Sequence, residues 1–365
     1  MKITDLPTPC LLLDRVKLLH NIKVMADALA RHGVPLRPHM KTAKSIDVAR
    51  LALAGQPGGI TVSTLAEAEY FSAHGIADIL YAVGITPQKL DQIGKLNAAG
   101  ASVMVITDDA DTAAAIAAHP TPPRCLIEID TGEARGGVGP EDDALLAIAA
   151  ALGTNFAGVM THAGHSYAGR TPADMTAIAA AERAGAVRAA DRLRQAGHAC
   201  AIVSIGSSPT ALYAAKLDGV TEIRAGVYMF GDLFQAEIGT HGLDDIAVTV
   251  LASVIGRRPG KLLVDAGGLA LSKDRSTEAV PKDYGFGLML DLDGTRRHGD
   301  AIVRRAYQEH GLIELDPAHP VDLPVGGLVR IAPNHTCMTA AAHDRYFVID
   351  GSDDVVAVWP RVNGW

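Results

Sequence analysis

Lys41 is the residue of this sequence best placed for covalent chemistry. It follows His39 and Met40 directly after a short apolar segment, which predicts a position at the end of a buried strand. Partial desolvation there would lower the pKa of the amine and make it a nucleophile toward an aldehyde. The alternative is a surface lysine that packs its stem on the protein and keeps its ammonium group in water.

A turn with one glycine and three hydroxyl groups offers a place for a phosphate. Residues 206–210 read Gly-Ser-Ser-Pro-Thr and precede a predicted helix, whose free N–H groups and dipole attract an anion. An ordinary serine or threonine helix cap would leave the same pattern. An aldehyde that carries a phosphate and needs a lysine is pyridoxal 5′-phosphate, so this turn and Lys41 together predict that cofactor.

A histidine and a cysteine two residues apart could bind a metal ion. His335 and Cys337 follow an apolar segment, and on a strand this spacing places both side chains on one face. Imidazole and thiolate suit zinc, and they accommodate manganese when water and substrate oxygens fill the remaining positions. The alternative is a packed cysteine beside an unrelated histidine, because two ligands alone are a weak signal.

Alternating strand and helix signals indicate how these residues would be positioned. Between about residue 35 and residue 230, short apolar segments alternate with alanine-rich segments of helical period. Eight such strands favour an α/β fold, a (β/α)8 TIM barrel, over an open sheet, and the ends of the strands form the active site of such a barrel. The expected strands are Leu36–His39, Ile60–Val62, Ile79–Tyr81, Ser102–Ile106, Cys125–Ile129, Phe156–Met160, Ala201–Ile205 and Thr221–Arg224.

The last third of the sequence has a different pattern. Short strand-like segments separated by proline and glycine follow residue 246, which predicts a mainly β domain. The clearest of them are Val248–Val254, Lys261–Asp265, Gly327–Ile331 and Tyr346–Asp350. We therefore expect a barrel domain over residues 14–245 and a β domain that combines residues 1–13 with residues 246–365 and carries the metal ligands.

The composition excludes several classes of protein. The chain has 365 residues and a net charge of −8, from 33 Lys and Arg against 41 Asp and Glu. Without basic clusters it is poorly suited to bind the phosphate backbone of a nucleic acid. No apolar segment approaches the roughly 20 residues that cross a bilayer, and the first residues lack a signal-like segment. We expect a cytoplasmic protein with no nucleic-acid or membrane partner.

The residues around Lys41 also carry a resemblance to a known family. The segment Arg37-Pro38-His39-Met40-Lys41-Thr42 resembles the cofactor-lysine motif of the fold-type III pyridoxal-phosphate enzymes. The most similar branch is the metal-activated one, which contains D-threonine aldolase and eukaryotic-type D-serine dehydratase. The resemblance extends from Thr8-Pro9 through residues 62–69 to residues 333–337. It implies a barrel of alanine-racemase type, a C-terminal β domain and a homodimer.

The resemblance implies a role for individual residues. Lys41 would bond to the cofactor aldehyde, His162 would stack on the pyridine ring, and Arg135 would reach the ring hydroxyl or the substrate. Arg224 matches the arginine that faces the pyridine nitrogen in alanine racemases. The other residues implied around the cofactor are Ser204, Gly206, Ser207, Ser208, Thr210, Gly226 and Tyr228.

A charged arginine beside the ring nitrogen has a chemical consequence. The guanidinium of Arg224 disfavours protonation of that nitrogen, which makes the cofactor a weaker electron sink. A divalent metal at His335 and Cys337, either zinc, manganese or magnesium, would then assist as a Lewis acid at the substrate's β-hydroxyl. His165 or Tyr167 would take a proton from that hydroxyl, or give one to it as it leaves.

These groups can perform two related reactions on a small D-amino acid. The leading hypothesis is a lyase that cleaves a D-3-hydroxy amino acid, such as D-threonine, to glycine and an aldehyde. The alternative is a dehydratase that converts D-serine or D-threo-3-hydroxyaspartate to a 2-oxo acid and ammonia. Cys337 is typical of the dehydratases, whereas an aspartate can stand there in the aldolases. A racemase, a decarboxylase and a non-enzymatic carrier of the cofactor are further alternatives.

Overall fold

The computed structural model describes all residues, 1–365, and divides into two units. The barrel unit contains residues 24–226 and 362–365, and the β unit contains residues 1–23 and 227–361. Each unit has its own sheet, with eight strands in the barrel unit and nine in the β unit. Helix α1 (Arg15–Ala30) crosses the boundary between them.

The barrel unit is built on eight parallel strands. They are β2 (Leu36–Pro38), β3 (Ile60–Val62), β4 (Asp78–Gly84), β5 (Ser102–Thr107), β6 (Cys125–Glu128), β7 (Phe156–Met160), β8 (Ile202–Ile205) and β9 (Glu222–Ala225). Their spatial order is β2-β9-β8-β7-β6-β5-β4-β3, so each strand from β3 to β9 lies beside its neighbours in sequence. The predicted α/β barrel and all eight of its strands are confirmed, with bounds that differ by three residues or fewer.

One joint of the barrel is much weaker than the others. Strand β2 pairs with β9 over three residues, but β2 and β3 share only an isolated parallel bridge between His39 and Thr61. The Met40 N–H donates to the Thr61 carbonyl at 2.8 Å, and the His39 N–H donates to the Ala225 carbonyl at 2.8 Å. The barrel therefore closes at the residues that immediately precede Lys41.

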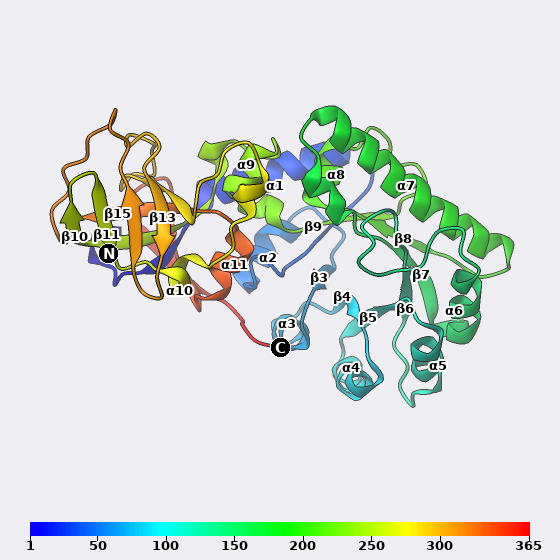
Figure 1. Ribbon diagram of the computed structural model, residues 1–365. Helices are drawn as coiled ribbons and strands as arrows, with labels where there is room; N and C mark the ends of the chain where they lie inside the picture. Colours follow the sequence, from blue (N-terminus) through cyan, green and yellow to red (C-terminus); the bar gives the residue numbers. More distant parts are fainter. The chain divides into compact units, whose positions relative to one another are not determined.

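Helices cover the outside of the barrel strands (Figure 1). They are α2 (Ile46–Leu53), α3 (Leu65–Ala73), α4 (Leu90–Ala98), α5 (Ala110–Ala118), α6 (Ala144–Leu152), α7 (Pro172–Gln195) and α8 (Ser208–Tyr213). A side-chain cap begins α3 at Thr64, α5 at Asp109 and α7 at Thr171. Apolar side chains of β4 to β7, including Leu80, Leu126 and Met160, form one core cluster of the barrel strands.

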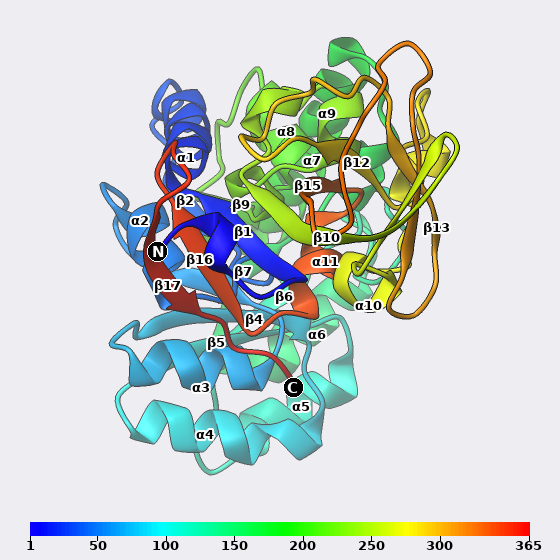
Figure 2. The ribbon, with the colours of Figure 1, turned by 90° about the vertical axis from the view of Figure 1, so that its left-hand side faces the viewer.

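The β unit is a single mixed sheet of nine strands. They are β1 (Cys10–Asp14), β10 (Val248–Arg258), β11 (Lys261–Val264), β12 (Gly287–Leu290), β13 (Ile302–Ala306), β14 (Gly311–Glu314), β15 (Leu328–Pro333), β16 (Arg345–Ile349) and β17 (Val355–Pro360). Strand β1 lies between β10 and β16, antiparallel to the first and parallel to the second. Figure 2 shows β1, β16 and β17 side by side. The sequence analysis missed β12, β13, β14 and β17, which are short and contain charged, glycine or exposed residues.

The division into units differs from the expected boundaries at residues 14 and 245. Residues 14–23 and 227–245, which were assigned to the barrel, belong to the β unit, and residues 362–365, assigned to the β domain, belong to the barrel unit. Hydrogen bonds explain this grouping. The Asp232 carboxylate accepts from the Thr336 N–H at 2.9 Å, and the Asn21 side chain donates to the Met229 and Asp245 carbonyls at 3.1 and 2.9 Å. The Ala247 N–H donates to the Phe230 carbonyl at 2.8 Å, directly before β10.

None of the helices combines the length and apolar character that a membrane crossing requires. The longest, α7, has 24 residues and includes several arginines and acidic residues.

Substitution of Gly158, in β7, tests how closely the barrel strands pack. Its φ is +151°, and a Cβ there would collide with the Ile202 backbone of the neighbouring strand β8. We expect Gly158→Ala to lower the free energy of unfolding by about 3 kcal/mol in urea titrations. The control is Gly84→Ala at the end of β4, where a Cβ meets open space. Equal stability of the two variants would contradict this account of the β7 packing.

Candidate active site

Five of the barrel strands end in polar residues at the same end of the barrel, because parallel strands share their direction. Lys41 lies in the turn after β2, where its N–H approaches His39 Nδ1 at 3.4 Å. Its side chain is exposed, so the expected partial burial of this lysine is wrong. Thr42 and Ala43, which follow it, are fully buried, and they anchor the turn while Lys41 projects from it.

His162 follows β7 and faces the charge of Lys41. Burial, together with the positive charges of Lys41 and Arg224, lowers the pKa of His162 to about 3. Its Nδ1 donates to the Gly206 carbonyl at 2.8 Å, which links the loop after β7 to the turn after β8. The imidazole is therefore neutral near pH 7, and its Nε2 keeps a lone pair.

The turn 206–210 is a buried helix start. Gly206 has a φ of +133°, and a Cβ there would collide with the Arg224 backbone, so only glycine fits. The Thr210 N–H donates to Ser207 Oγ at 3.1 Å, and the Ser207 N–H donates to Thr210 Oγ1 at 3.0 Å. Ser207 Oγ also lies 2.8 Å from Ser166 Oγ. These two hydroxyls and their N–H groups thus form a helix cap, and an anion bound here would replace part of this capping.

Glu182, on α7, is a residue of this site that the sequence analysis missed. Its side chain is fully buried, and its Oε1 accepts from the Ala163 N–H at 3.0 Å and from the Gly206 N–H at 2.9 Å. Burial raises the pKa of Glu182, and the hydrogen bonds to Thr210 and Gly206 oppose that rise only in part. A signal was present, because Glu182 stands in the buried stripe of α7 between Ala179 and Ala186 at helical spacing.

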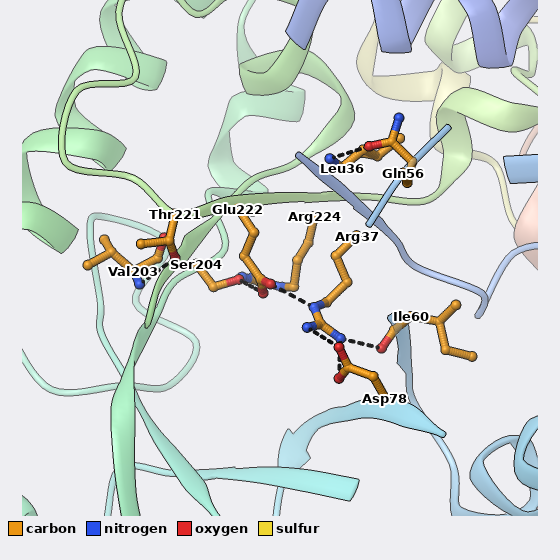
Figure 3. Close-up of polar contacts among 10 residues, drawn as sticks. All are labelled: Leu36, Arg37, Gln56, Ile60, Asp78, Val203, Ser204, Thr221, Glu222 and Arg224. Atoms are coloured by element: carbon orange, nitrogen blue, oxygen red, sulfur yellow. Dashed lines mark hydrogen bonds and ion pairs between the residues drawn. The ribbon is translucent and has the colours of Figure 1, made fainter. Parts of the chain in front are cut away.

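Arg224, on β9, is fully buried among hydrogen-bond acceptors. Its Nη1 donates to Ser204 Oγ and its Nη2 donates to the Thr161 carbonyl, each at 2.6 Å. Burial lowers the pKa of Arg224, and the charge of Glu222 is the largest influence that raises it again. Ser204, expected at the cofactor, also donates to Glu222 Oε1 at 2.6 Å (Figure 3). Its hydroxyl is therefore bonded to protein on both sides.

The remaining expected residues of the barrel mouth lie on the loops after β6 and β7. The Tyr167 and His162 ring centroids are 6.5 Å apart. His165 Nδ1 is buried without a hydrogen-bond partner, and its ring lies beside Gly132. Arg135 is exposed, and its Nη1 lies 3.4 Å from Glu133 Oε1. The structure thus brings His165 and Tyr167 to the side of the mouth that holds His162, with Arg135 on the adjoining loop.

These residues fit pyridoxal 5′-phosphate chemically. Lys41 offers an amine that can bond to an aldehyde, and neutral His162 offers a flat ring without charge repulsion. The unpartnered His165 Nδ1 is a buried polar atom that a ligand would satisfy. Gly226, expected near the phosphate, follows β9 in the barrel unit, whereas Tyr228 is buried in the 3-10 turn Val227–Met229 of the β unit.

The expected metal ligands, His335 and Cys337, lie in the β unit but not on a strand. Strand β15 ends at Pro333, and His335 is the residue before helix α11 (Thr336–Ala341), with Cys337 in its first turn. The expected strand placement is therefore wrong, because the helix begins where a continued strand was expected. The two side chains still interact, since a hydrogen bond with Cys337 contributes to the raised pKa of His335.

His335 is held by a second partner. Its Nδ1 lies 2.6 Å from Asp274 Oδ2. Burial lowers the pKa of His335, but the bonds to Asp274 and Cys337 outweigh burial and raise it to about 11. No group of three or more His, Cys, Asp or Glu side chains is arranged to bind a metal. A metal at His335 and Cys337 would thus have two protein ligands and several open positions, which fits an ion that also binds substrate.

Two family models match this chain. The alanine racemase N-terminal domain matches residues 13–233, and a serine dehydratase domain matches residues 247–349. The first covers more than half of the sequence and includes the whole barrel unit apart from the last residues.

Several curated proteins are similar over the full length. D-threo-3-hydroxyaspartate dehydratase of Delftia sp. (strain HT23) is 44% identical over 100% of this chain and 99% of its own length. D-serine dehydratase of Dictyostelium discoideum is 31% identical over 100% and 98%. The 3-hydroxy-D-aspartate aldolase of Paracoccus denitrificans is 30% identical over 99% and 92%.

Solved structures of similar proteins also superpose on this chain. The structure of the Delftia dehydratase superposes with a TM-score of 0.95 at 42% identity, and the match covers 100% of both chains. Variants of that dehydratase in which a histidine, or a cysteine two residues further on, is replaced by alanine match equally well, and the cysteine variant is described as metal-free.

Glu182 generates a prediction about pH. The pKa of Glu182 is raised in the folded protein, so the folded state binds this proton more tightly than the unfolded state does. The folded protein therefore loses stability as the pH rises above the pKa of an unfolded glutamate, about 4.3. We expect the stability of the wild type, relative to Glu182→Gln, to fall between pH 5 and pH 8 in urea unfolding. The control is Glu141→Gln, because Glu141 is an exposed carboxylate paired with Arg188. The stability difference between the wild type and this variant should not change over the same pH range. A flat difference for Glu182→Gln as well would refute the prediction.

Proposed function

Since this chain belongs to the fold-type III pyridoxal-phosphate enzymes with a serine dehydratase domain, we propose that it is a lyase that dehydrates a D-3-hydroxy amino acid to a 2-oxo acid and ammonia. Membership of the family confirms the resemblance first seen in the residues around Lys41. The substrate class we propose is a D-3-hydroxy amino acid with a carboxylate side chain, of the D-threo-3-hydroxyaspartate type.

The observation that carries this choice of reaction is the 44% identity to a dehydratase over the whole chain. The aldolase relative is 30% identical over a similar length. Cys337 also favours dehydration over aldol cleavage, because cysteine at this position is typical of the dehydratase branch. The sequence analysis placed aldol cleavage first and dehydration second, and the comparisons favour the second.

Three residues of the barrel unit support binding of the cofactor. Lys41 would bond to its aldehyde, neutral His162 would pack on its ring, and Arg224 would face its ring nitrogen. The cofactor, when bound, withdraws electrons from the α-carbon of an amino acid joined to it. The turn 206–210 would hold the phosphate once Ser207 and Thr210, which cap each other in the helix start, direct their hydroxyls to it.

The chain's own residues would move the protons. Lys41 is exposed at the barrel mouth, where its free amine would take the α-proton of a bound substrate. Tyr167 and His165 stand on the loop after β7, from which they could donate a proton to the departing hydroxyl. Arg135 carries a positive charge on the neighbouring loop and would attract a substrate carboxylate.

The β unit would supply a metal site. A divalent ion held by His335 and Cys337 would act as a Lewis acid toward the β-hydroxyl of the substrate. Asp274 would orient His335 by accepting from its Nδ1, which leaves Nε2 for the ion. The spacing of the two residues matches the histidine and cysteine replaced in the Delftia dehydratase, whose cysteine variant was solved in the metal-free form. A homodimer, implied by the family resemblance, remains a prediction.

Aldol cleavage is the second candidate function. The same lysine, metal ligands and proton donors would serve it, and an aldolase that acts on 3-hydroxy-D-aspartate is among the relatives. The two reactions differ in the bond that breaks, Cα–Cβ in the aldolase and Cβ–O in the dehydratase, so the products distinguish them.

A product assay tests the proposal. The purified protein, loaded with pyridoxal 5′-phosphate and zinc or manganese, is incubated with D-threo-3-hydroxyaspartate, D-serine and D-threonine, with and without chelator. We expect a 2-oxo acid and ammonia, and at least a tenfold loss of rate with chelator. Glycine and an aldehyde as the main products would favour the aldolase, and the L-enantiomer produced without chelator sensitivity would favour a racemase. Release of carbon dioxide would favour a decarboxylase, and cofactor binding with no turnover would favour a carrier.

Lys41→Ala is expected to abolish the visible absorption band of the bound cofactor and to reduce activity by at least about 1,000-fold, because no other amine takes its place. Lys41→Arg keeps the positive charge but cannot form the bond, and it should behave in the same way. Lys216→Ala removes an exposed lysine elsewhere in the barrel unit and serves as the control. An unchanged band in Lys41→Ala would remove the assigned role of this residue.

His335→Ala is expected to keep the visible absorption of the cofactor but to lose turnover by at least about 100-fold, with no recovery on addition of zinc or manganese. Metal content of the purified variant should fall in parallel. The control is His310→Ala, which removes an exposed histidine from the same unit. Full activity of the His335 variant would exclude a metal site at this position.

A further inference from the structure

A chain of polar groups, buried except for the half-exposed Asp78, connects Arg224 to neighbouring strands of the barrel (Figure 3). Arg224 donates to Ser204 Oγ, and Ser204 donates to Glu222 Oε1, each at 2.6 Å. Glu222 Oε2 accepts from Arg37 Nε at 2.8 Å. Arg37 then donates to Asp78 through Nη1 at 2.9 Å and through Nη2 at 3.0 Å. Ser204, Glu222 and Arg37 thus connect β8, β9 and β2 to Asp78 at the start of β4.

The direction of each hydrogen bond in this chain is fixed by the carboxylate of Glu222. A serine hydroxyl has one hydrogen, and here that hydrogen points to Glu222 because an ionised carboxylate only accepts. The lone pairs of Ser204 Oγ therefore face Arg224, whose guanidinium only donates. An amide at position 222 could donate instead, and the serine hydrogen would then be free to turn toward Arg224.

The charges of this chain balance each other inside the barrel. Arg224 and Arg37 are 3% and 6% exposed, and neither has bulk water to stabilise its charge. Arg37 has carboxylates at both ends, from Glu222 and Asp78. Arg224 reaches Glu222 only through Ser204, so the carboxylate supports its charge while the guanidinium keeps other N–H groups for a further acceptor.

We propose that Ser204 and Glu222, held by Arg37, are positioning residues that fix the orientation and charge of Arg224 toward the ring nitrogen of the cofactor. This inference rests on the proposed function, because it assigns Arg224 a partner on bound pyridoxal 5′-phosphate. A fixed guanidinium there disfavours protonation of the ring, so the chain of residues sets the electron-withdrawing power of the cofactor through Arg224. None of these three residues touches substrate in this role.

A purely structural role predicts a different result. Arg37, Glu222 and Asp78 could serve only to tie neighbouring strands together, and Ser204 would then be incidental. Ser204→Ala separates the two roles, because it removes the link to Arg224 and leaves the ion pairs of Arg37 in place. Glu222→Gln disturbs both the link to Arg224 and the ion pair with Arg37. Its lost negative charge makes protonation of the cofactor harder, whereas a loosened Arg224 makes protonation easier.

The experiment measures the cofactor rather than turnover. Wild type, Ser204→Ala, Glu222→Gln and the surface control Glu141→Gln are titrated with pyridoxal 5′-phosphate, and the absorption of each bound form is recorded from pH 6 to pH 9.5. We expect Ser204→Ala and Glu222→Gln to bind the cofactor about tenfold more weakly than the wild type does. We expect Ser204→Ala to shift the midpoint of the pH-dependent spectral change upward by about one unit, because a loosened guanidinium opposes protonation less. Glu222→Gln should shift it upward by less, because its lost negative charge acts in the opposite direction. Glu141→Gln should match the wild type.

The outcomes separate this inference from the proposed function. If Ser204→Ala leaves affinity and midpoint unchanged while Glu222→Gln lowers the midpoint, the effect is the lost charge alone and the positioning role is overturned. The same holds if both variants only lower the melting temperature. If the wild type takes up no pyridoxal 5′-phosphate, the proposed function fails and the inference fails with it. Upward shifts in both variants, with thermal stability of Ser204→Ala near that of the wild type, support it.

Discussion

The barrel depends on the joint between β2 and β3, where ordinary strand pairing stops. One bridge, between His39 and Thr61, joins two strands whose other neighbours are joined by ladders of several residues. Arg37 spans the same joint with its side chain, donating to the Ile60 carbonyl at 3.3 Å and to Asp78. Lys41 follows directly after this joint. The residue on which the proposed chemistry depends is thus placed where few backbone hydrogen bonds act and buried ion pairs compensate.

Buried charges also hold the loops that surround the site. Glu182 accepts hydrogen bonds from the loop after β7 and from the turn after β8. Arg224 donates to the carbonyl of Thr161, directly after β7, and to the side chain of Ser204 on β8. An apolar core of the same volume would usually be as stable as such buried charges, so their value lies in fixing one arrangement of the loops. Loops that are fixed before a ligand arrives lose less conformational freedom on binding.

Most of the barrel could be predicted from the sequence, because buried parallel strands are continuous apolar segments between capped helices. The strands of the β unit were harder, since they depend on pairing between distant segments and several carry charges. The placement of His335 failed because the pattern of two residues does not distinguish a strand from a helix start. The sequence predicted the role of Lys41 from its neighbours but not its exposure, which depends on how the turn projects. Glu182 was missed because its partners lie about 20 residues away on other elements.

The place of β1 in the β unit has a consequence for biosynthesis. This strand leaves the ribosome before the barrel strands, but both of its partners, β10 and β16, follow the barrel in sequence. Its apolar residues, including Leu11, Leu12 and Leu13, are fully buried in the finished sheet. During translation they stay unpaired until β10 has been synthesised, while the barrel strands between β1 and β10 can already associate with neighbours in sequence. The nascent chain therefore exposes an apolar strand while the whole barrel is made, and shielding of that strand by a chaperone would matter more than for a strand that pairs locally.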